Sequence, residues 1–297
     1  MKRLVFLAAL PLLAGAKSPG PPPPATPAGW VAACADWDDW DKAGPPFRIH
    51  GNSFYVGTCG IAAILVTSPA GHVLIDSGTE KGAAVIAANI LRLGFRLKDV
   101  KLLLHSHEHF DHVGGHAVIQ RLTGATVAAS VAAAPVLESG RDSPEDPQAG
   151  MHAAMTPVKV GRRLSHGEVV RLGGLALTAH ATPGHTPGAL SWSWTSCTGR
   201  SRDCRRIVLA DSLSAVSSDA YRFTDHPAYL AAYRAGVARV AALPCDILIT
   251  PHPSASDLRS RLAAGALNVP PGQCATYART IGERLDQRLA REAGSKP

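Results

Sequence analysis

Residues 100–115 read VKLLLHSHEHFDHVGG, an apolar run that ends in a dense group of imidazole and carboxylate side chains. A packed hydrophobic core does not contain polar groups at that density, whereas neutral imidazole and carboxylate are ligands that zinc prefers. Two residues apart, His107 and His109 can bind one ion. Asp111 and His112 follow directly and can face a second ion beside the first. The stretch therefore predicts a metal site just after a β-strand.

Three later segments place polar side chains directly after predicted strands. They read TPGHTPG at 182–188, ADSLS at 210–214 and PHP at 251–253. Rigid Pro and Gly turns hold His185 in the first of them and His252 in the last. In layered α/β proteins the ligands gather at the carboxyl ends of strands, so these turns are expected to converge on the histidine cluster.

The periodicity of apolar residues predicts an α/β protein. Short β-rich runs and stretches with helical spacing alternate along the chain, in two halves of similar pattern. Strands are expected at 54–56, 61–66, 72–75, 101–104, 126–129, 169–171, 176–181, 190–194, 207–209 and 246–250, and helices at 81–93, 114–122, 226–243 and 274–290. Two β-then-α halves packed sheet against sheet satisfy this order. The stretch 140–160, broken by Pro and Gly, is expected to be a disordered loop or a lid over a site.

Together these motifs resemble the metallo-β-lactamase superfamily. The H-x-H-x-D-H pattern, the TPGHTPG turn, the ADSLS segment and the late PHP are similar to those of the class B, subclass 3 zinc β-lactamases. The resemblance runs from about residue 37 to the C-terminal helix. It implies a four-layer αβ/βα sandwich, the fold of that superfamily. It also implies a zinc-dependent hydrolase that opens the β-lactam ring of penicillins, cephalosporins and carbapenems and so confers antibiotic resistance.

The resemblance further implies two zinc ions with three protein ligands each. The first ion would be bound by His107, His109 and His185, and the second by Asp111, His112 and His252. A hydroxide that bridges the two ions would be the nucleophile, so the six ligands are also the expected catalytic residues. A pair of ions about 3.5–4 Å apart lowers the pKa of a shared water and stabilises both the attacking and the leaving atoms.

The segment at 210–214 narrows the subclass. The first subclass of zinc β-lactamases has a cysteine ligand in this region, and the second has Asn in place of the first ligand histidine. This chain instead has Ser212 and His107. The resemblance implies that Ser212 and Ser214 bind the carboxylate of the substrate. Gln148, in the long loop, is also expected to face the site.

Two alternatives to a β-lactamase remain open at this point. Lactonase and thioesterase relatives use an Asp from the same region to bridge both metals, and Asp211 stands one residue before Ser212. If Asp211 is a ligand, another di-zinc hydrolase is indicated, namely a lactonase, a thioesterase or a sulfatase. A protein of a different class, a non-catalytic metal-binding or periplasmic binding protein, would lack an open coordination position and the pair of serines.

The N-terminus has the parts of an export signal. Lys2 and Arg3 precede an apolar stretch at 4–13, and the small residues at 14–16 fit a cleavage site. The chain is therefore expected to consist of a signal peptide (1–16), a Pro-rich flexible segment (17–29) and a single hydrolase domain (30–297). The expected location is the periplasm or the exterior of the cell. An uncleaved N-terminal anchor is the alternative.

Six cysteines agree with an oxidising compartment. They allow fifteen connectivities, and order and locality favour the pairs Cys34–Cys59, Cys197–Cys204 and Cys245–Cys274. The formal charge of +7, or +5 without Lys2 and Arg3, is spread along the chain and forms no basic stripe for nucleic acid. The expected partner is a small-molecule β-lactam, with no stable membrane anchor. A monomer is expected because no segment resembles a dedicated interface.

Overall fold

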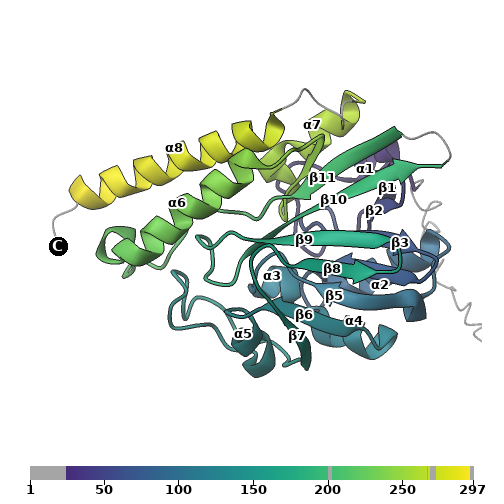
Figure 1. Ribbon diagram of the computed structural model, residues 1–297, viewed down its shortest axis with the longest axis horizontal. Helices are drawn as coiled ribbons and strands as arrows, with labels where there is room; N and C mark the ends of the chain where they lie inside the picture. Colours follow the sequence, from purple (N-terminus) through teal and green to yellow (C-terminus); the bar gives the residue numbers. More distant parts are fainter. Residues whose placement is uncertain (1–24, 200–202, 266, 268–271, 295–297) are drawn as a thin grey trace, which may run out of the picture.

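Two β-sheets face each other in the computed structural model, which describes residues 25–199, 203–265, 267 and 272–294 (Figure 1). The first sheet has seven strands in the order β1-β2-β3-β4-β5-β6-β7, and the second has five in the order β12-β11-β10-β9-β8. The first sheet comprises β1 (Phe47–His50), β2 (Ser53–Tyr55), β3 (Ile64–Ser68), β4 (Gly71–Ile75), β5 (Val100–Leu104), β6 (Thr126–Ser130) and β7 (Val160–Leu164). The second comprises β8 (Val169–Leu172), β9 (Leu175–Ala181), β10 (Leu190–Thr198), β11 (Asp203–Leu209) and β12 (Ile247–Ile249).

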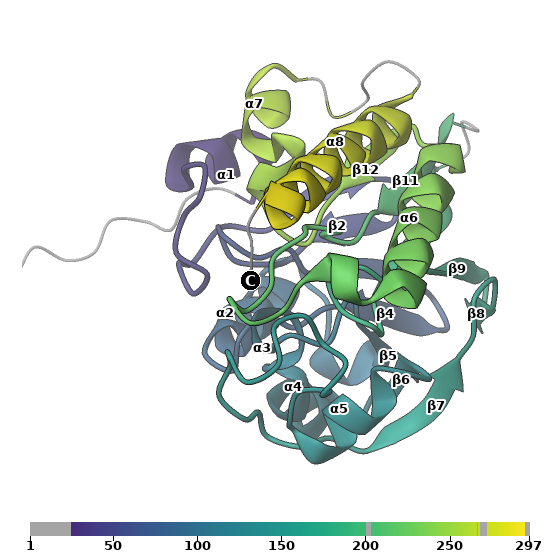
Figure 2. The ribbon, with the colours of Figure 1, turned by 90° about the vertical axis from the view of Figure 1, so that its left-hand side faces the viewer.

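Helices cover the outer face of each sheet. Figure 2 shows α6 and α8 on one side of the pair of sheets and α2, α4 and α5 on the other. The helices are α1 (Pro27–Ala33), α2 (Gly82–Arg92), α3 (Phe110–Val113), α4 (His116–Thr123), α5 (Ala134–Ser139), α6 (Pro227–Ala242), α7 (Leu258–Ala263) and α8 (Gln273–Gly294), with short 3-10 helices at Leu97–Asp99, Phe223–Asp225 and Pro253–Ser256. This arrangement confirms the predicted four-layer αβ/βα sandwich.

Hydrophobic cores separate the four layers, and alternation along the strands divides the side chains between them. In β3, Ile64 and Val66 belong to the core between the two sheets, whereas Leu65 packs with the helices on the outer face. Trp192 of β10, fully buried, reaches the same inter-sheet core from the opposite sheet. Tyr233 of α6 lies in a further core beneath α6 and α8. A strand such as β3 thus serves two cores because successive side chains point to opposite faces.

The long, strongly patterned elements lie where the sequence predicts them. The helix expected at 226–243 is α6 (Pro227–Ala242), which begins with a proline in its first turn. Two strands, β1 and β7, were not predicted. Both are edge strands of the first sheet. The interior of β7 is Gly161 followed by two arginines, so only its ends are buried and the apolar alternation that marks a strand is missing.

Helical structure is already present before the predicted domain boundary at residue 30. Helix α1 starts at Pro27, inside the segment 17–29 that was expected to be flexible. The Thr26 hydroxyl caps it by accepting a hydrogen bond from the Gly29 backbone N–H at 3.1 Å. A Thr cap followed by Pro in the first helical position is a helix-start signal, and it outweighs the Pro-rich composition of the preceding residues.

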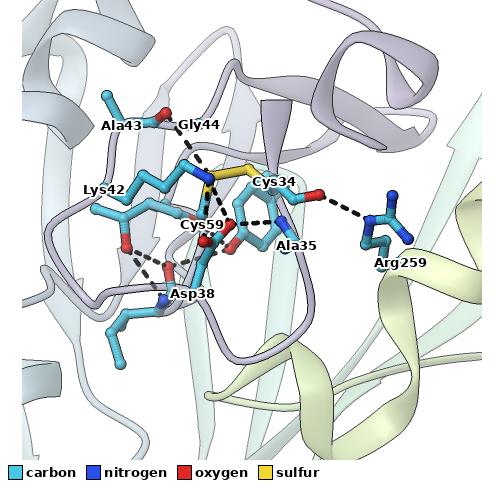
Figure 3. Close-up of a disulfide and its surroundings, with 12 residues drawn as sticks. Cys34, Ala35, Asp38, Lys42, Ala43, Gly44, Cys59 and Arg259 are labelled. Carbon is cyan, nitrogen blue, oxygen red and sulfur yellow. Dashed lines mark hydrogen bonds and ion pairs between the residues drawn. A yellow bond between two sulfur atoms is a disulfide. The ribbon is translucent and has the colours of Figure 1, made fainter. Parts of the chain in front are cut away.

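All three predicted disulfides are confirmed: Cys34–Cys59, Cys197–Cys204 and Cys245–Cys274. The second joins residues that stand directly opposite each other in the β10–β11 hairpin. The first ties the end of α1 to the loop before β3, next to the ion pair between Lys42 and Asp38 (Figure 3). Arg259 also donates to the Cys34 carbonyl at 2.7 Å, so the N-terminal segment is anchored to α7 as well.

Two further predictions concern the loops and the N-terminus. Residues 140–159 form no helix or strand up to the start of β7, as the breaks at Pro and Gly predict. The predicted signal peptide lies outside the described residues. Within the part of the chain that the structure does describe, no helix is both long enough and apolar enough to cross a bilayer.

Candidate metal centre

The six predicted ligands lie in segments that follow strand ends. Strand β5 ends at Leu104, and the single-turn helix α3 then carries two of the four ligands of the H-x-H-x-D-H motif. His185 follows β9 and His252 follows β12. Strand β5 runs parallel to β4 and β6, and β12 runs parallel to β11. Parallel strands present their carboxyl ends at one edge of a sheet, which is why loops far apart in sequence converge.

The first cluster consists of His107, His109 and His185. One potential ligand atom of each lies within 4.8 Å of those of the other two, and all three side chains are buried. Their ring centroids are 4.7 to 5.0 Å apart, with the rings nearly perpendicular to one another. Three imidazoles so close together can share one cation.

One nitrogen of each ring in this cluster is already held by the protein. The contacts are His107 Nδ1 to Asp211 Oδ1 (2.8 Å), His109 Nε2 to Asp146 Oδ2 (2.9 Å) and His185 Nδ1 to the Ser214 carbonyl (3.0 Å). Nε2 of His107 is buried and has no hydrogen-bond partner among the described residues. A buried nitrogen left without a partner costs free energy unless a ligand or metal engages it, so the cluster fits a metal ion.

The second cluster is a triangle of Asp111 Oδ2, His112 Nε2 and His252 Nε2. Its sides measure 3.1 Å from Asp111 to His112, 3.4 Å from Asp111 to His252 and 3.3 Å between the two imidazoles. Ligand atoms at about 2.0–2.1 Å around a tetrahedral zinc stand about 3.3 Å from one another. The triangle therefore matches the ligand spacing that zinc requires.

The electrostatics of the two clusters differ. Burial lowers the pKa of the His107 imidazole well below its ordinary value, and burial likewise lowers the pKa of His185 to about 3. Both rings are then neutral at pH 7, the form that binds a metal. Burial also opposes charge on His112, but the Asp111 and Asp76 carboxylates outweigh it and raise its pKa to about 10. These surroundings favour a positive charge, which a metal cation can supply in place of the proton.

Asp76 supports the ligand loop and was not singled out from the sequence. It is fully buried at the end of β4, with a left-handed backbone (φ 64°). Its carboxylate accepts hydrogen bonds from the Ser106 backbone N–H at 2.6 Å and hydroxyl at 2.7 Å, and lies 3.5 Å from His112 Nδ1. A backbone strained in this way is retained where the surrounding contacts determine it. The signal that located Asp211, an acid just past a strand end, applies equally to Asp76.

Glu108 joins two of the ligand loops. Its buried carboxylate accepts hydrogen bonds from the Thr186 hydroxyl at 2.6 Å and the Gly188 backbone N–H at 2.7 Å. A Cβ at Gly188 would lie only 2.6 Å from the Ala133 backbone nitrogen, so glycine is needed for this approach. Glu108 therefore has a structural role, because its carboxylate fixes the loop of His185 against that of His107 and His109.

The three predicted substrate-binding residues differ in their contacts. The Ser212 hydroxyl is buried and has no hydrogen-bond partner among the described residues. The Ser214 hydroxyl is 2.9 Å from Nδ1 of His185, so it already serves a ligand. Gln148 is buried with its Nε2 unpartnered within the described chain, and its backbone N–H donates to Asp146 at 2.7 Å.

Two tyrosines from the outer helices hold the ADSLS segment in place. The Tyr277 hydroxyl of α8 lies 2.9 Å from the Asp211 carbonyl and 2.8 Å from that of Ser212. The Tyr233 hydroxyl of α6 donates to the carbonyl of Leu213, whose backbone is left-handed (φ 46°). The helical layer therefore sets the position of the serine segment relative to the metal ligands.

Aromatic side chains border the site. Trp40, 41% exposed, packs its ring 5.8 Å from that of His252 and 5.7 Å from that of Phe110. Trp30 is instead part of the inter-sheet core, and Trp37 is 79% exposed. Of the three N-terminal tryptophans, therefore, one packs directly against a predicted metal ligand.

The other histidines of the loop have structural roles. Nε2 of the buried His105 accepts a hydrogen bond from the Ser130 backbone N–H at 3.0 Å, and buried His116 pairs with the Ser77 hydroxyl at 2.7 Å. His152 was given no role from the sequence. The structure places its ring 4.9 Å from that of His109, so the long loop reaches the first cluster.

A sandwich of two sheets with clustered imidazole and carboxylate groups at the strand ends defines a metal-dependent α/β hydrolase. A family model described as the metallo-β-lactamase superfamily matches residues 56–252. The chain belongs to this superfamily, and the predicted resemblance to its subclass B3 is confirmed by the solved structures it matches.

Two of those structures cover nearly the same length of chain. The metallo-β-lactamase MIM-2 is 58% identical, with a TM-score of 0.86 over 90% of this chain and 98% of that one. MEM-A1, a subclass B3 metallo-β-lactamase from a soil metagenome library, is 47% identical, with a TM-score of 0.82 over 87% of this chain and all of that one.

A more distant similarity covers only part of the chain. A hydroxyacylglutathione hydrolase of Anaeromyxobacter dehalogenans is 31% identical over 159 residues, which are 53% of this chain and 48% of that protein. The chain thus spans about half the length of the curated relatives it matches. Because this match is partial, the contacts within the site are the better guide to which bond the protein hydrolyses.

Proposed function

We propose that this protein hydrolyses the amide bond of β-lactams with two zinc ions as cofactors. His107, His109 and His185 are assigned to the first ion, and Asp111, His112 and His252 to the second. The unpartnered Nε2 of His107 and the zinc-like spacing of the second cluster support this assignment. When bound, the two ions would polarise the substrate carbonyl and lower the pKa of a nearby water.

The position of Asp211 carries the choice of reaction. One carboxylate oxygen lies 2.8 Å from Nδ1 of His107, and the other accepts the Leu213 backbone N–H at 3.3 Å. With both oxygens engaged by the protein, Asp211 orients a ligand histidine rather than bridging two metals. This favours a β-lactamase over the lactonases and thioesterases that need a bridging Asp. The 58% identity to a metallo-β-lactamase over almost its whole chain supports the same choice.

The remaining residues bind and orient the substrate. The Ser212 hydroxyl can donate a hydrogen bond to the carboxylate that β-lactams carry, because no described residue uses it. Gln148 offers a further donor from the long loop. Ser214 can contact the same carboxylate while it holds His185. Asp111, between two imidazoles, can accept a hydrogen bond from the attacking water as well as bind metal.

Removal of metal should abolish the activity of the purified protein. We expect hydrolysis of a penicillin, a cephalosporin and a carbapenem, followed as loss of ring absorbance, to stop after treatment with a chelator. Added Zn²⁺ should restore it. A protein that binds two zinc ions per chain but turns over none of the three substrates would refute the proposed reaction, and a lactone and a thioester assayed in parallel would reveal the alternative.

Substitution Ser212→Ala should weaken substrate binding with little effect on the chemical step. A hydrogen bond from a neutral donor to a buried carboxylate contributes about 1.5 kcal/mol or more, so we expect KM to rise about 10-fold. The value of kcat should change far less. The exposed Ser165, directly after β7, supplies the control Ser165→Ala, which should leave both constants unchanged. A fall in kcat with KM unchanged would instead assign Ser212 to the reaction step.

We also propose that the chain is exported and that residues 1–16 are removed. The mature protein is proposed to be a monomer. The three disulfides support an oxidising compartment, because such bonds are rare in the reducing cytosol. The N-terminal sequence and the sedimentation behaviour of protein recovered from the periplasm test both statements.

A further inference from the structure

Asp146 is a buried carboxylate in a loop that has no helix or strand. It is only 3% exposed, although the loop from residue 140 to 159 crosses the surface. Oδ2 lies 2.9 Å from Nε2 of His109, and Oδ1 accepts the backbone N–H of Gln148 at 2.7 Å. Burying a carboxylate is costly unless its oxygens are hydrogen-bonded, and here a metal-ligand candidate supplies one of the two partners.

This contact determines which nitrogen of His109 is available to a metal. A carboxylate can only accept, so Nε2 of His109 carries the proton and Nδ1 carries the lone pair. In His107 and His185 the arrangement is reversed, because there the protein holds Nδ1. His109 therefore depends on Asp146 for a ring orientation that its two partners in the cluster obtain from other segments.

The middle of the loop has few other attachments to the rest of the protein. Its base is closed by backbone bonds from Met155 to Gly140 and from Val158 to Leu137. Toward the tip, the Pro147 carbonyl accepts the Ser218 backbone N–H at 2.9 Å. The His152 ring packs edge-on against that of His109 and at a tilt against that of Phe110. The bond from Gly150 to Asp142, also near the tip, lies within the loop itself.

We propose that Asp146 is a positioning residue of the first metal site, and that it couples metal binding at His109 to docking of the loop 140–159. The inference rests on the proposed role of His109 as a ligand. Binding that favours the oriented ring also favours the docked loop, and by linkage a docked loop strengthens metal binding by the same factor. Since Gln148 lies two residues after Asp146, the same coupling brings a substrate-binding residue into place when metal is present.

The test measures zinc binding and loop protection on the full-length mature protein. Zn²⁺ affinity is determined by competition with a chromophoric chelator for wild type, Asp146→Ala, Asp146→Asn and the control Glu145→Gln, which removes an exposed charge from the same loop. Loss of a carboxylate behind a ligand histidine typically weakens metal binding by about 10- to 100-fold. We expect a loss of that size for Asp146→Ala, a smaller one for Asp146→Asn, and none for Glu145→Gln.

Amide hydrogen exchange supplies the second readout. In wild type and Glu145→Gln, added Zn²⁺ should slow exchange at residues 142–152, whereas both Asp146 variants should exchange quickly with and without metal. Circular dichroism of the metal-free proteins checks that each variant folds. If Asp146→Ala does not fold, Asp146→Asn, which keeps the shape of the side chain, is the variant that tests the proposal. Wild-type zinc affinity or wild-type loop protection in both variants would overturn the proposal. Neither readout uses a β-lactam, so this inference and the proposed reaction can fail separately.

Discussion

Hydrolysis by His107→Ala should fall by at least about 10³-fold, which corresponds to about 4 kcal/mol of transition-state stabilisation. His107 belongs to the first cluster, and its buried Nε2 has no hydrogen-bond partner among the described residues. Removing it takes away a ligand of the first cluster and leaves the Asp211 carboxylate buried with one partner fewer. We therefore expect kcat to fall together with the number of zinc ions retained per chain after gel filtration, as measured by atomic emission.

The control for this variant is a histidine outside the site. His166 is exposed, and His166→Ala should keep the zinc content and activity of wild type. If His107→Ala retains two zinc ions and normal turnover, the assignment of the first cluster is wrong. Loss of activity with full zinc content would point to a role in orientation rather than in binding.

Trp192→Ala should cause a large loss of stability. Trp192 is fully buried between the two sheets, and its indole N–H donates to the His105 carbonyl at 2.8 Å. Truncation of a buried Trp leaves a cavity and costs about 4 kcal/mol. For a domain of this size the midpoint of thermal unfolding should fall by about 10 °C. Urea titration followed by circular dichroism measures the free energy of unfolding directly.

An exposed residue of the same type makes a matched control. Trp37 is 79% exposed, and Trp37→Ala should change the free energy of unfolding by no more than about 0.5 kcal/mol. Equal effects of the two substitutions would mean that the inter-sheet core does not limit stability. Because the Trp192 hydrogen bond reaches the residue just before the ligand loop, we also expect Trp192→Ala to weaken zinc binding.

The convergence of the six candidate ligands could be predicted because each carries a local signal. His107, His109, Asp111 and His112 share one short motif, and so dense a set of ligand groups directly after a strand is typical of a metal site. His252, like the histidine of the TPGHTPG turn, stands on a Pro-framed turn at a strand end, where α/β folds gather ligands. The central layers were equally predictable, since buried strands and the long helices carry strong periodicity. The family resemblance then predicted that the residues of these separate motifs belong to one site.

The groups behind the ligands could not be predicted in the same way. Asp146 reaches His109 from a loop with no periodicity, so nothing near it in the sequence marks the contact. Glu108 and Gly188 lie 80 residues apart, and only the converging loops bring them together. In the edge strand β7, two arginines interrupt the apolar alternation that would mark a strand. Such features depend on tertiary packing, which overrides local propensity at the edges of sheets and in loops.

The disulfide between Cys34 and Cys59 links the oxidation state of the chain to the structure of its proposed substrate site. It closes a covalent ring, and within that ring Trp40 stands against His252. All six proposed ligands come later in the chain and lie outside the ring. A chain held under reducing conditions would therefore still bring its proposed ligands together, whereas the segment that carries Trp40 would lose its covalent link and keep only non-covalent contacts, such as the hydrogen bond from the Thr58 hydroxyl to the Trp40 carbonyl. Oxidation would then fix the aromatic border formed by Trp40, as a separate step of maturation.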